Sequence, residues 1–275
     1  MTLRRRDFLT RMSAPAVGLK SFRSRGRVYS PEGVKAIAFD AFAVFDPRPV
    51  FAAVNELYPQ KGADLSNLWR TRQFEYTWLR TLSGRYCDFW QVTSDALVYA
   101  AKALRLDLTP NARDSLMREY LRLRCWPDAP DSLSMLRNSG IRLALLSNMT
   151  VKMLDSGIRN SGLDGAFDQI LSTDRVKACK PDPRAYGMAP HAFGLKRDRI
   201  LFVPFAAWDA AGAVSFGYPT FWLNRQRQPN EELGVAASGS GASLRDLVAF
   251  LGLQSQSASN SERAGTPGRQ SVSAW

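Results

Sequence analysis

The spacing of apolar and polar positions divides much of this chain into short buried strands and longer amphipathic helices. Residues 35–39 form an apolar run that ends at Asp40, a pattern typical of a buried parallel strand whose last residue emerges at the carboxyl edge of a sheet. Similar runs follow much later, at 141–146, 167–171, 199–203 and 220–223. The sequence therefore predicts five strands, the first of them far from the others.

Amphipathic helical segments lie between the later strands. Examples are 131–138, which Gly140 closes as a C-terminal cap, and 182–193. Strands that alternate with helices predict an α/β fold with a doubly wound parallel sheet. Such a sheet binds its ligands at the carboxyl ends of the strands.

About 80 residues between the first strand and the rest carry no strand signal. The segments 65–82, 89–104 and 111–123 each place apolar residues three and four positions apart, which predicts helices. Glycine and proline separate these segments. We therefore expect a core domain formed by 34–47 and 128–253, with a helical cap, 48–127, inserted after the first strand.

The two ends of the chain differ in composition from the part between them. Residues 254–275 are rich in Ser, Gln and Gly and predict a disordered tail. Residues 1–33 form a basic leader; nine basic and two acidic side chains within 1–35 supply +7 of the net charge of +12. Because the rest is nearly balanced and carries no nucleic-acid-binding motif, we expect no nucleic-acid partner.

Within the leader, Arg5-Arg6-Asp7-Phe8-Leu9 resembles a bacterial twin-arginine export signal. The apolar stretch that follows, 12–19, is short and contains Pro15. Two alternatives stay open. A working signal would place the protein in the periplasm, and a basic extension or decayed signal would leave it in the cytoplasm.

Overall composition excludes several classes of protein. A chain of 275 residues, 45% hydrophobic and 23% charged, is long enough to bury a substantial core, and no run of about 18 apolar residues predicts a membrane span. The single histidine, His191, excludes a His-rich zinc site. Cys87, Cys125 and Cys179 have the spacing of neither a disulfide framework nor a metal motif, so we interpret them as buried or incidental thiols.

Five motifs in a fixed order carry the chemistry. They are F-D-A-F-A-V-F-D (39–46), L-W-R-T-R-Q-F-E-Y-T-W-L-R (68–80), L-L-S-N (145–148), K-P-D-P-R-A-Y (180–186) and A-W-D-A-A-G-A (207–213). Each is weak alone. Together they resemble the haloacid dehalogenase superfamily, and within it a type II L-2-haloacid dehalogenase, over about residues 34–250.

The chemistry of such a site can also be argued from the residues. A carboxylate nucleophile at the end of a strand, Asp40, must be ionised, and Lys180 is the natural cation to keep it so. In phosphatases of the superfamily a second Asp follows two residues later and further carboxylates hold Mg²⁺, whereas here that position is Phe42. A departing halide needs no proton, so this sequence predicts carbon–halogen chemistry without a metal or other cofactor.

The resemblance implies a role for each matching residue. Asp40 would attack C2 of a small 2-haloacid with inversion, Arg70 would receive the halide with Asn148, and Asp209 would help water attack the resulting ester. Ser147 and backbone N–H groups after Asp40 would bind the substrate carboxylate, and Tyr186 would position groups near Lys180. The apolar pocket would be lined by Phe42, Phe74, Phe89 and Trp208. Alternatives remain for four of these residues: Arg70 as one of many surface arginines on a basic helix, Tyr186 and Trp208 as core aromatics, and Asp209 as a helix N-cap.

Three positions depart from the family pattern. Val44 replaces a threonine whose hydroxyl would hydrogen-bond the nucleophile, and Pro204 and Ala206 replace a serine and an asparagine before the Ala-Trp-Asp. Proline and alanine side chains cannot hold a water. The groups for attack are thus present while those for hydrolysis are reduced to Asp209.

The leading hypothesis is a hydrolase that displaces halide from 2-haloalkanoic acids through an aspartyl ester, with weakened ester hydrolysis. The alternative is an inactive relative that binds a small carboxylate, and a phosphatase is an outlier. The halogen, the chain length and the physiological substrate do not follow from the sequence. Members of this family often form dimers, which leaves a homodimer open.

Overall fold

Four parallel strands form the centre of the molecule in the order β3-β2-β1-β4. The computed structural model describes residues 33–253, so the basic leader and the predicted tail lie outside the described residues. The pairing sets Ala36 of β1 against Arg142 of β2 and Ile200 of β4. The strands are β1 (Ala36–Phe39), β2 (Arg142–Ser147), β3 (Gln169–Ser172) and β4 (Ile200–Val203). This parallel sheet with helices on both faces is the predicted α/β fold.

Two further strands extend this arrangement beyond β4. β5 (Phe221–Leu223) runs beside β4 through a parallel bridge between Phe202 and Thr220, and it pairs with β6 (Gly239–Gly241). β6 was not predicted because its Gly-Ser-Gly sequence carries no apolar signal. The five predicted strands are all present, and each of their ends lies within two residues of its predicted position.

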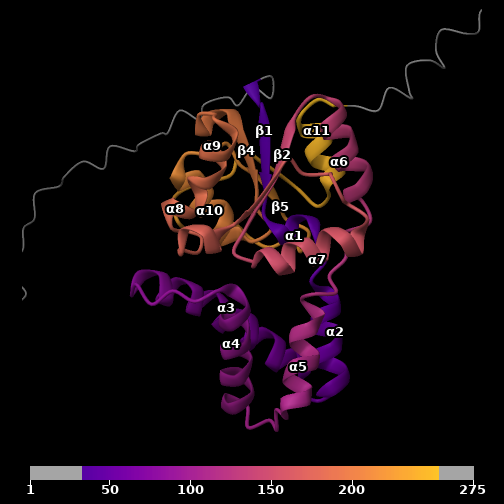
Figure 1. Cartoon of the computed structure of the whole chain (residues 1–275), viewed down its shortest axis with the longest axis vertical. Coiled ribbons are helices and arrows are strands. Elements are labelled where there is room, and N and C mark those ends of the chain that lie inside the picture. The colour runs from indigo at the N-terminus through magenta and orange to yellow at the C-terminus, as the bar shows by residue number, and fades with distance from the viewer. Residues whose placement is uncertain (1–32, 254–275) are drawn as a thin grey trace, which may run out of the picture.

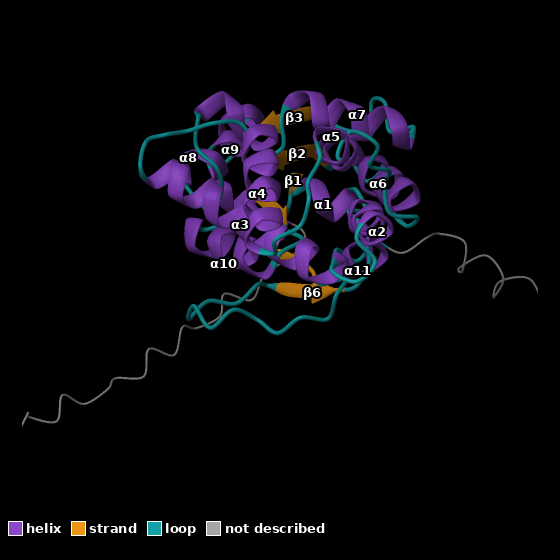
Figure 2. Cartoon of the chain, turned by 90° about the horizontal axis from the view of Figure 1, so that it is seen from below, coloured by secondary structure: helices purple, strands orange, loops and turns teal. Residues whose placement is uncertain are grey.

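Alternate residues of the strands face two different helical layers. Ile37 and Phe39 contribute to a core with the layer that contains α6 (Ala129–Asn138), α7 (Val151–Ser161) and α11 (Leu244–Phe250). Ala36 and Ala38 face the opposite layer (Figure 2). That layer contains α8 (Pro183–Tyr186), α9 (Met188–Phe193) and α10 (Ala207–Phe216). Because strand side chains alternate, the short apolar runs are buried on both faces.

The segment predicted as one helix over 182–193 is instead broken into α8 and α9. Pro190 has no N–H to donate to the carbonyl of Tyr186 four residues earlier, and that carbonyl accepts the hydroxyl of Tyr218. The single-helix prediction was therefore wrong at Gly187. Within the described residues the core also contains the short 3₁₀ turns η2 (Thr173–Val176) and η3 (Arg197–Arg199).

The inserted segment forms a helical bundle beneath the carboxyl ends of the strands (Figure 1). It follows α1 (Ala41–Val44), the single turn that begins at Asp40. Its longest helix, α3, starts three residues before the predicted segment, and α5 ends four residues earlier than predicted. The bundle contains α2 (Arg48–Leu57), α3 (Gly62–Leu82), α4 (Phe89–Ala103) and α5 (Pro110–Glu119). We call residues 48–127 the cap; the domain boundaries themselves stay a prediction.

The described residues contain neither a helix able to cross a membrane nor a disulfide bond. None of the helices within 33–253 combines the length and the apolar character that crossing a membrane requires. All three cysteines are free thiols, with Cys179 buried and Cys87 and Cys125 half-buried.

Candidate active site

Asp40 occupies the junction between β1 and α1, at the carboxyl edge of the sheet. Its backbone N–H donates to Val203 O at 3.0 Å, and its Oδ2 accepts the Phe42 N–H at 3.0 Å as the cap of α1. The residue is 8% exposed and lines a pocket between core and cap. The strand-to-helix turn therefore fixes the carboxylate and presents it to the pocket.

Lys180 lies between two carboxylates beneath this pocket. Its ammonium donates to Asp40 Oδ1 at 2.8 Å and to Asp209 Oδ2 at 2.6 Å, and the residue is 1% exposed. Burial acts to lower the pKa of Lys180, but the charges of Asp209 and Asp40 outweigh it and raise that pKa above its ordinary value. The side chain therefore remains an ammonium ion that holds both carboxylates.

Asp209 is the more enclosed of the two carboxylates. It lies in the first turn of α10, is 1% exposed, and its Oδ1 accepts the Tyr186 hydroxyl at 2.7 Å. Burial raises the pKa of Asp209 to about 6; Lys180 opposes this rise and the charge of Asp40 adds to it. The N-cap of α10 is Ala206, so the alternative that Asp209 caps this helix was wrong.

Tyr186 supports Asp209 from behind and does not line the pocket. Its hydroxyl lies so close to Gly212 of α10 that a Cβ at that position would approach it to 2.5 Å. Burial, followed by the charge of Asp209, raises the pKa of Tyr186 well above its ordinary value, so the phenol stays a proton donor. Glycine at 212 thus allows the contact that orients Asp209.

Ser147, the last residue of β2, and Asn148, which follows it, lie at the same edge of the sheet. Asn148 Oδ1 accepts the Lys180 N–H at 2.9 Å and the Thr173 hydroxyl at 3.3 Å. Ser147 Oγ accepts the Met149 N–H at 3.2 Å. These contacts use the acceptor atoms, which leaves the Asn148 amide N–H groups and the Ser147 hydroxyl proton available to the pocket.

The cap contributes a guanidinium that has no carboxylate partner. Arg70 of α3 lines the pocket and is half-buried, and none of the acidic side chains within 33–253 forms an ion pair with it. Its neighbour Gln73 is held by Thr93, to whose Oγ1 it donates at 2.6 Å, and Trp69 donates to Thr93 O at 2.8 Å. The helix that carries Arg70 is therefore anchored within the cap, while its charge faces the pocket.

Aromatic side chains form most of the remaining wall. The four predicted lining residues, Phe42, Phe74, Phe89 and Trp208, all line the pocket. Phe74 of the cap packs against Trp208 of the core, with ring centroids 5.2 Å apart. The Trp208 Nε1 is buried and has no hydrogen-bond partner in the described part of the chain. Trp208 therefore closes the cap–core contact and also offers one free donor.

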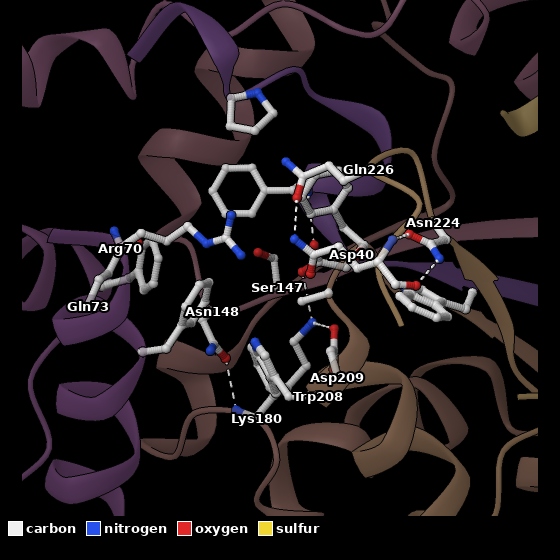
Figure 3. A pocket seen from close by; sticks show the side chains of 18 of the residues that line it. Asp40, Arg70, Gln73, Ser147, Asn148, Lys180, Trp208, Asp209, Asn224 and Gln226 are labelled. Atoms are coloured by element: carbon white, nitrogen blue, oxygen red, sulfur yellow. Dashed lines mark hydrogen bonds and ion pairs between the residues drawn. The ribbon is translucent and has the colours of Figure 1, made fainter. Parts of the chain in front are cut away.

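The pocket brings together ten of the eleven predicted site residues, with Tyr186 directly behind them. Figure 3 shows Arg70 and Asn148 on one side of Asp40, and Lys180 with Asp209 below it. Their catalytic roles stay a prediction. Of the three departures, Ala206 lines the pocket, Pro204 uses its carbonyl to accept Leu223 N–H at 3.0 Å, and Val44 is buried in the core.

Sequence reasoning missed several lining residues. Gln73 lies three positions after Arg70, so its helical spacing could have placed it beside that residue. Tyr120 and the loop after β5 gave no comparable signal, because only the fold brings them to this edge. The missed residues are Pro47, Phe51, Gln73, Tyr120, Phe205, Trp222, Asn224, Gln226 and Gln228.

Comparison with known proteins identifies the family. Residues 26–217 match the model of the haloacid dehalogenase-like hydrolases. The (S)-2-haloacid dehalogenase of Pseudomonas sp. (strain YL) is 44% identical over 216 residues, which cover 78% of this chain and 93% of that protein. The chain therefore belongs to the haloacid dehalogenase-like hydrolase family.

Solved structures agree with this assignment. A crystal structure of an L-2-haloacid dehalogenase superposes with a TM-score of 0.78 at 43% identity, covering 80% of this chain and 99% of that one. The L-2-haloacid dehalogenase of Xanthobacter autotrophicus with chloropropionic acid covalently bound gives a TM-score of 0.73 at 30% identity. That match covers 79% of this chain and 98% of the other.

Proposed function

We propose that this hydrolase removes halide from small 2-haloalkanoic acids through an ester on Asp40. The observation that carries the proposal is the Arg70 guanidinium. It has no carboxylate partner among residues 33–253, and it shares an aromatic pocket with an Asp40 that Lys180 already holds. A nucleophilic carboxylate held by Lys180 and an unpaired guanidinium in one apolar pocket suit a reaction in which the carboxylate displaces a halide ion from carbon and the guanidinium receives that ion.

The first step is a displacement at C2 of the substrate. An Asp40 oxygen attacks C2 and forms a C–O bond, and the carbon–halogen bond breaks with its electron pair on the halide. The Arg70 guanidinium, the Asn148 amide and the Trp208 Nε1–H are the donors that receive the halide. Because the oxygen arrives opposite the departing halogen, the configuration at C2 inverts.

The substrate carboxylate needs donors of its own. Ser147 offers a hydroxyl proton at the carboxyl end of β2, close to Asp40. The Phe42 N–H already donates to Asp40 Oδ2, so of the backbone groups after Asp40 only the Ala41 N–H is left for this task. Ser147 is thus the main side-chain contact that we assign to this carboxylate.

The second step hydrolyses the ester. Water adds to Cγ of Asp40 and gives a proton to Asp209; the bond between Cγ and the ester oxygen then breaks. The departing oxygen takes the proton from Asp209 and becomes the hydroxyl of a 2-hydroxy acid. The new carboxyl of Asp40 ionises beside Lys180, which releases one proton to solvent. The relative with chloropropionic acid covalently bound supports an ester intermediate.

Halide release from (S)-2-chloropropionate, followed over many enzyme equivalents, tests the proposal. We expect chloride and (R)-lactate in equal amounts, little release from the (R)-substrate, and an adduct on the peptide that carries Asp40. The rate should be the same with Mg²⁺ and with EDTA, since the Lys180 ammonium lies between the two carboxylates. Activity that depends on Mg²⁺ would point to the phosphatase hypothesis.

The alternative is an inactive relative that binds a small carboxylate. It predicts neither chloride nor adduct, but a 2-hydroxy acid that binds in the pocket. The buried Asp40–Lys180–Asp209 arrangement argues against it, because burying such charges is costly and a mere carboxylate-binding pocket does not need two carboxylates of its own.

A further inference from the structure

A polar loop, residues 224–228, follows β5 and reaches the mouth of the pocket; we call it the rim loop. Asn224, Gln226 and Gln228 all line the pocket, although the two glutamines are exposed on its rim. The Asn224 side chain donates to Gln228 O at 2.7 Å and accepts the Gln228 N–H at 2.8 Å. These two bonds tie the ends of the loop together and fix its shape.

The loop is also attached to the element that carries the nucleophile. The half-buried Arg225 forms an ion pair with Asp128 at 3.0 Å, stacks over Trp126 at 4.5 Å, and donates to Ala43 O at 3.5 Å. Ala43 lies in α1, the turn that begins at Asp40. The rim loop and the nucleophile therefore share one anchored framework.

The two rim glutamines form a hydrogen-bonded pair. Gln228 Nε2 donates to Gln226 Oε1 at 3.1 Å (Figure 3). This bond leaves the Gln226 side-chain N–H groups and the Gln228 Oε1 without a partner among the described residues. One donor and one acceptor, both uncharged, match the hydrogen-bonding capacity of a single water.

The strand that leads into the rim loop lies beside the apolar part of the wall. In β5, Leu223 N–H donates to Pro204 O at 3.0 Å and Trp222 Nε1 donates to Phe205 O at 3.2 Å, so β5 runs along the 204–206 segment and the rim loop begins where this contact ends. That segment presents Phe205 and Ala206 to the pocket, directly before the helix that holds Asp209. The amides of the rim loop thus supply polar side chains on a side where the neighbouring backbone segment supplies none.

We propose that Gln226 and Gln228 together hold the water that hydrolyses the Asp40 ester. This inference rests on the proposed function. The anionic groups of the substrate meet Arg70, Asn148 and Ser147 on other sides of the pocket, whereas an uncharged pair on a solvent-exposed rim can take water from bulk.

The held water supplies the atoms that the second step needs. Its oxygen bonds to Cγ of Asp40, one proton passes to Asp209 and from there to the departing alkoxide, and the other stays on the new carboxyl until that group ionises. The glutamines exchange no proton in this step. They act by orienting the water, so their removal should slow hydrolysis and leave displacement unchanged.

Single-turnover kinetics with enzyme in excess over (S)-2-chloropropionate test this assignment. Chloride appearance measures displacement, and lactate appearance with decay of the Asp40 adduct measures hydrolysis. We expect Gln226→Met and Gln228→Met each to slow hydrolysis about tenfold, as loss of one or two hydrogen bonds would, with chloride appearance unchanged. Gln60→Met, an exposed glutamine in the cap, is the matched control and should change neither rate.

Each other outcome has a definite meaning. Equal hydrolysis rates in wild type and both glutamine variants would overturn the inference, with the proposed function intact. Slower chloride appearance with a raised KM would also overturn it and would assign the pair to substrate binding. If wild type releases no chloride and forms no adduct, the proposed function itself fails, and this inference fails with it.

Discussion

The two sides of the pocket differ in how their polar groups are held. On the side of β1 and β2, Asp40, Asn148 and Lys180 are buried and joined by hydrogen bonds of 2.8 to 2.9 Å. On the side of β4 and α10, the segment that leads into α10 is Pro204–Phe205–Ala206, and the polar side chains of the separate rim loop line the same pocket. The side of β1 and β2 is preorganised for attack on the substrate, whereas the side of β4 and α10 depends on the rim loop for polar groups that could hold water.

This contrast separates the two chemical steps physically. Displacement needs a fixed carboxylate and a halide site, and both belong to the buried side and the cap. Hydrolysis needs an ordered water, which the β4 side can hold only with help. Changes on the first side should therefore have large effects on both steps, and changes on the second side should have smaller effects on hydrolysis alone.

The largest effect should come from Asp40→Asn. An amide cannot attack C2, so chloride release should fall by at least about 10⁴-fold. The amide oxygen can still accept from Lys180, which should keep the fold, and thermal unfolding of the variant checks this. Residual multiple turnover above that level, confirmed by product analysis, would contradict covalent catalysis by Asp40.

Lys180→Met should be the next most severe change. The variant leaves two carboxylates buried without their cation, so they would tend to take up protons, and Asp40 would lose its nucleophilic form. We expect activity to fall about 10³-fold and the free energy of unfolding to fall by about 3 to 5 kcal/mol. Chloride release and urea unfolding measure the two effects.

Lys177→Met provides the comparison for this change. Lys177 pairs with Asp174 at 2.6 Å, but its side chain is 65% exposed. An exposed pair contributes about 0 to 1 kcal/mol, so both activity and stability should stay close to wild type. A near-native rate for Lys180→Met would remove Lys180 from the mechanism.

The sequence predicted the buried side of the site well because strand ends are visible in it. A run of apolar residues that stops at Asp40, at Ser147 or before Pro204 marks the carboxyl edge of a parallel sheet, where those residues must gather. Arg70 was predicted to belong to the site from the 68–80 motif alone. Nothing in helical spacing shows that α3 would present it to the strand ends.

The rim loop could not be predicted in this way. Gln226 and Gln228 lie in a polar segment after a three-residue strand, and their position depends on Arg225 reaching Asp128 about 100 residues away. The break at Gly187 differs, because Pro190 signals it locally; only the donor that satisfies the freed carbonyl of Tyr186, the Tyr218 hydroxyl, comes from a distant element. Long-range contacts of this kind leave no local pattern.

Acid should weaken hydrolysis more than displacement. Burial raises the pKa of Asp209 to about 6 in the free enzyme, and the charge of Asp40 adds to this rise. Esterification removes that charge, so in the adduct Asp209 becomes protonated, and can no longer accept a proton from water, only at a pH below about 6. Adduct decay should therefore be constant above about pH 6 and should slow by about tenfold for each pH unit once the pH is below the lowered pKa. The adduct of Asp209→Asn should decay slowly at every pH, and a wild-type decay rate that is as fast at about pH 3 as at neutral pH would exclude Asp209 as the base.

The smallest effect should come from returning a polar group to the β4 side with Ala206→Asn. The new amide would lie at the start of the helix that holds Asp209 and would face the same pocket as the rim glutamines, where a further contact to water should raise the hydrolysis rate about two- to tenfold without changing displacement. Ala206 is also the N-cap of α10 and makes no side-chain cap hydrogen bond, so asparagine can instead cap the helix.

The two roles open to the amide introduced at position 206, capping α10 and binding water, can be distinguished by measuring stability and adduct decay. Capping raises the free energy of unfolding by about 1 kcal/mol and leaves adduct decay unchanged, whereas water binding speeds decay. Ala206→Asp separates them further, because aspartate caps equally well but places a second negative charge beside Asp209 and should slow hydrolysis. Pro204→Ser is less suitable, since it adds an N–H and a hydroxyl at a buried position where Pro204 now supplies only its carbonyl to Leu223. Faster decay in Ala206→Asn together with slower decay in Ala206→Asp would show that the β4 side limits the second step.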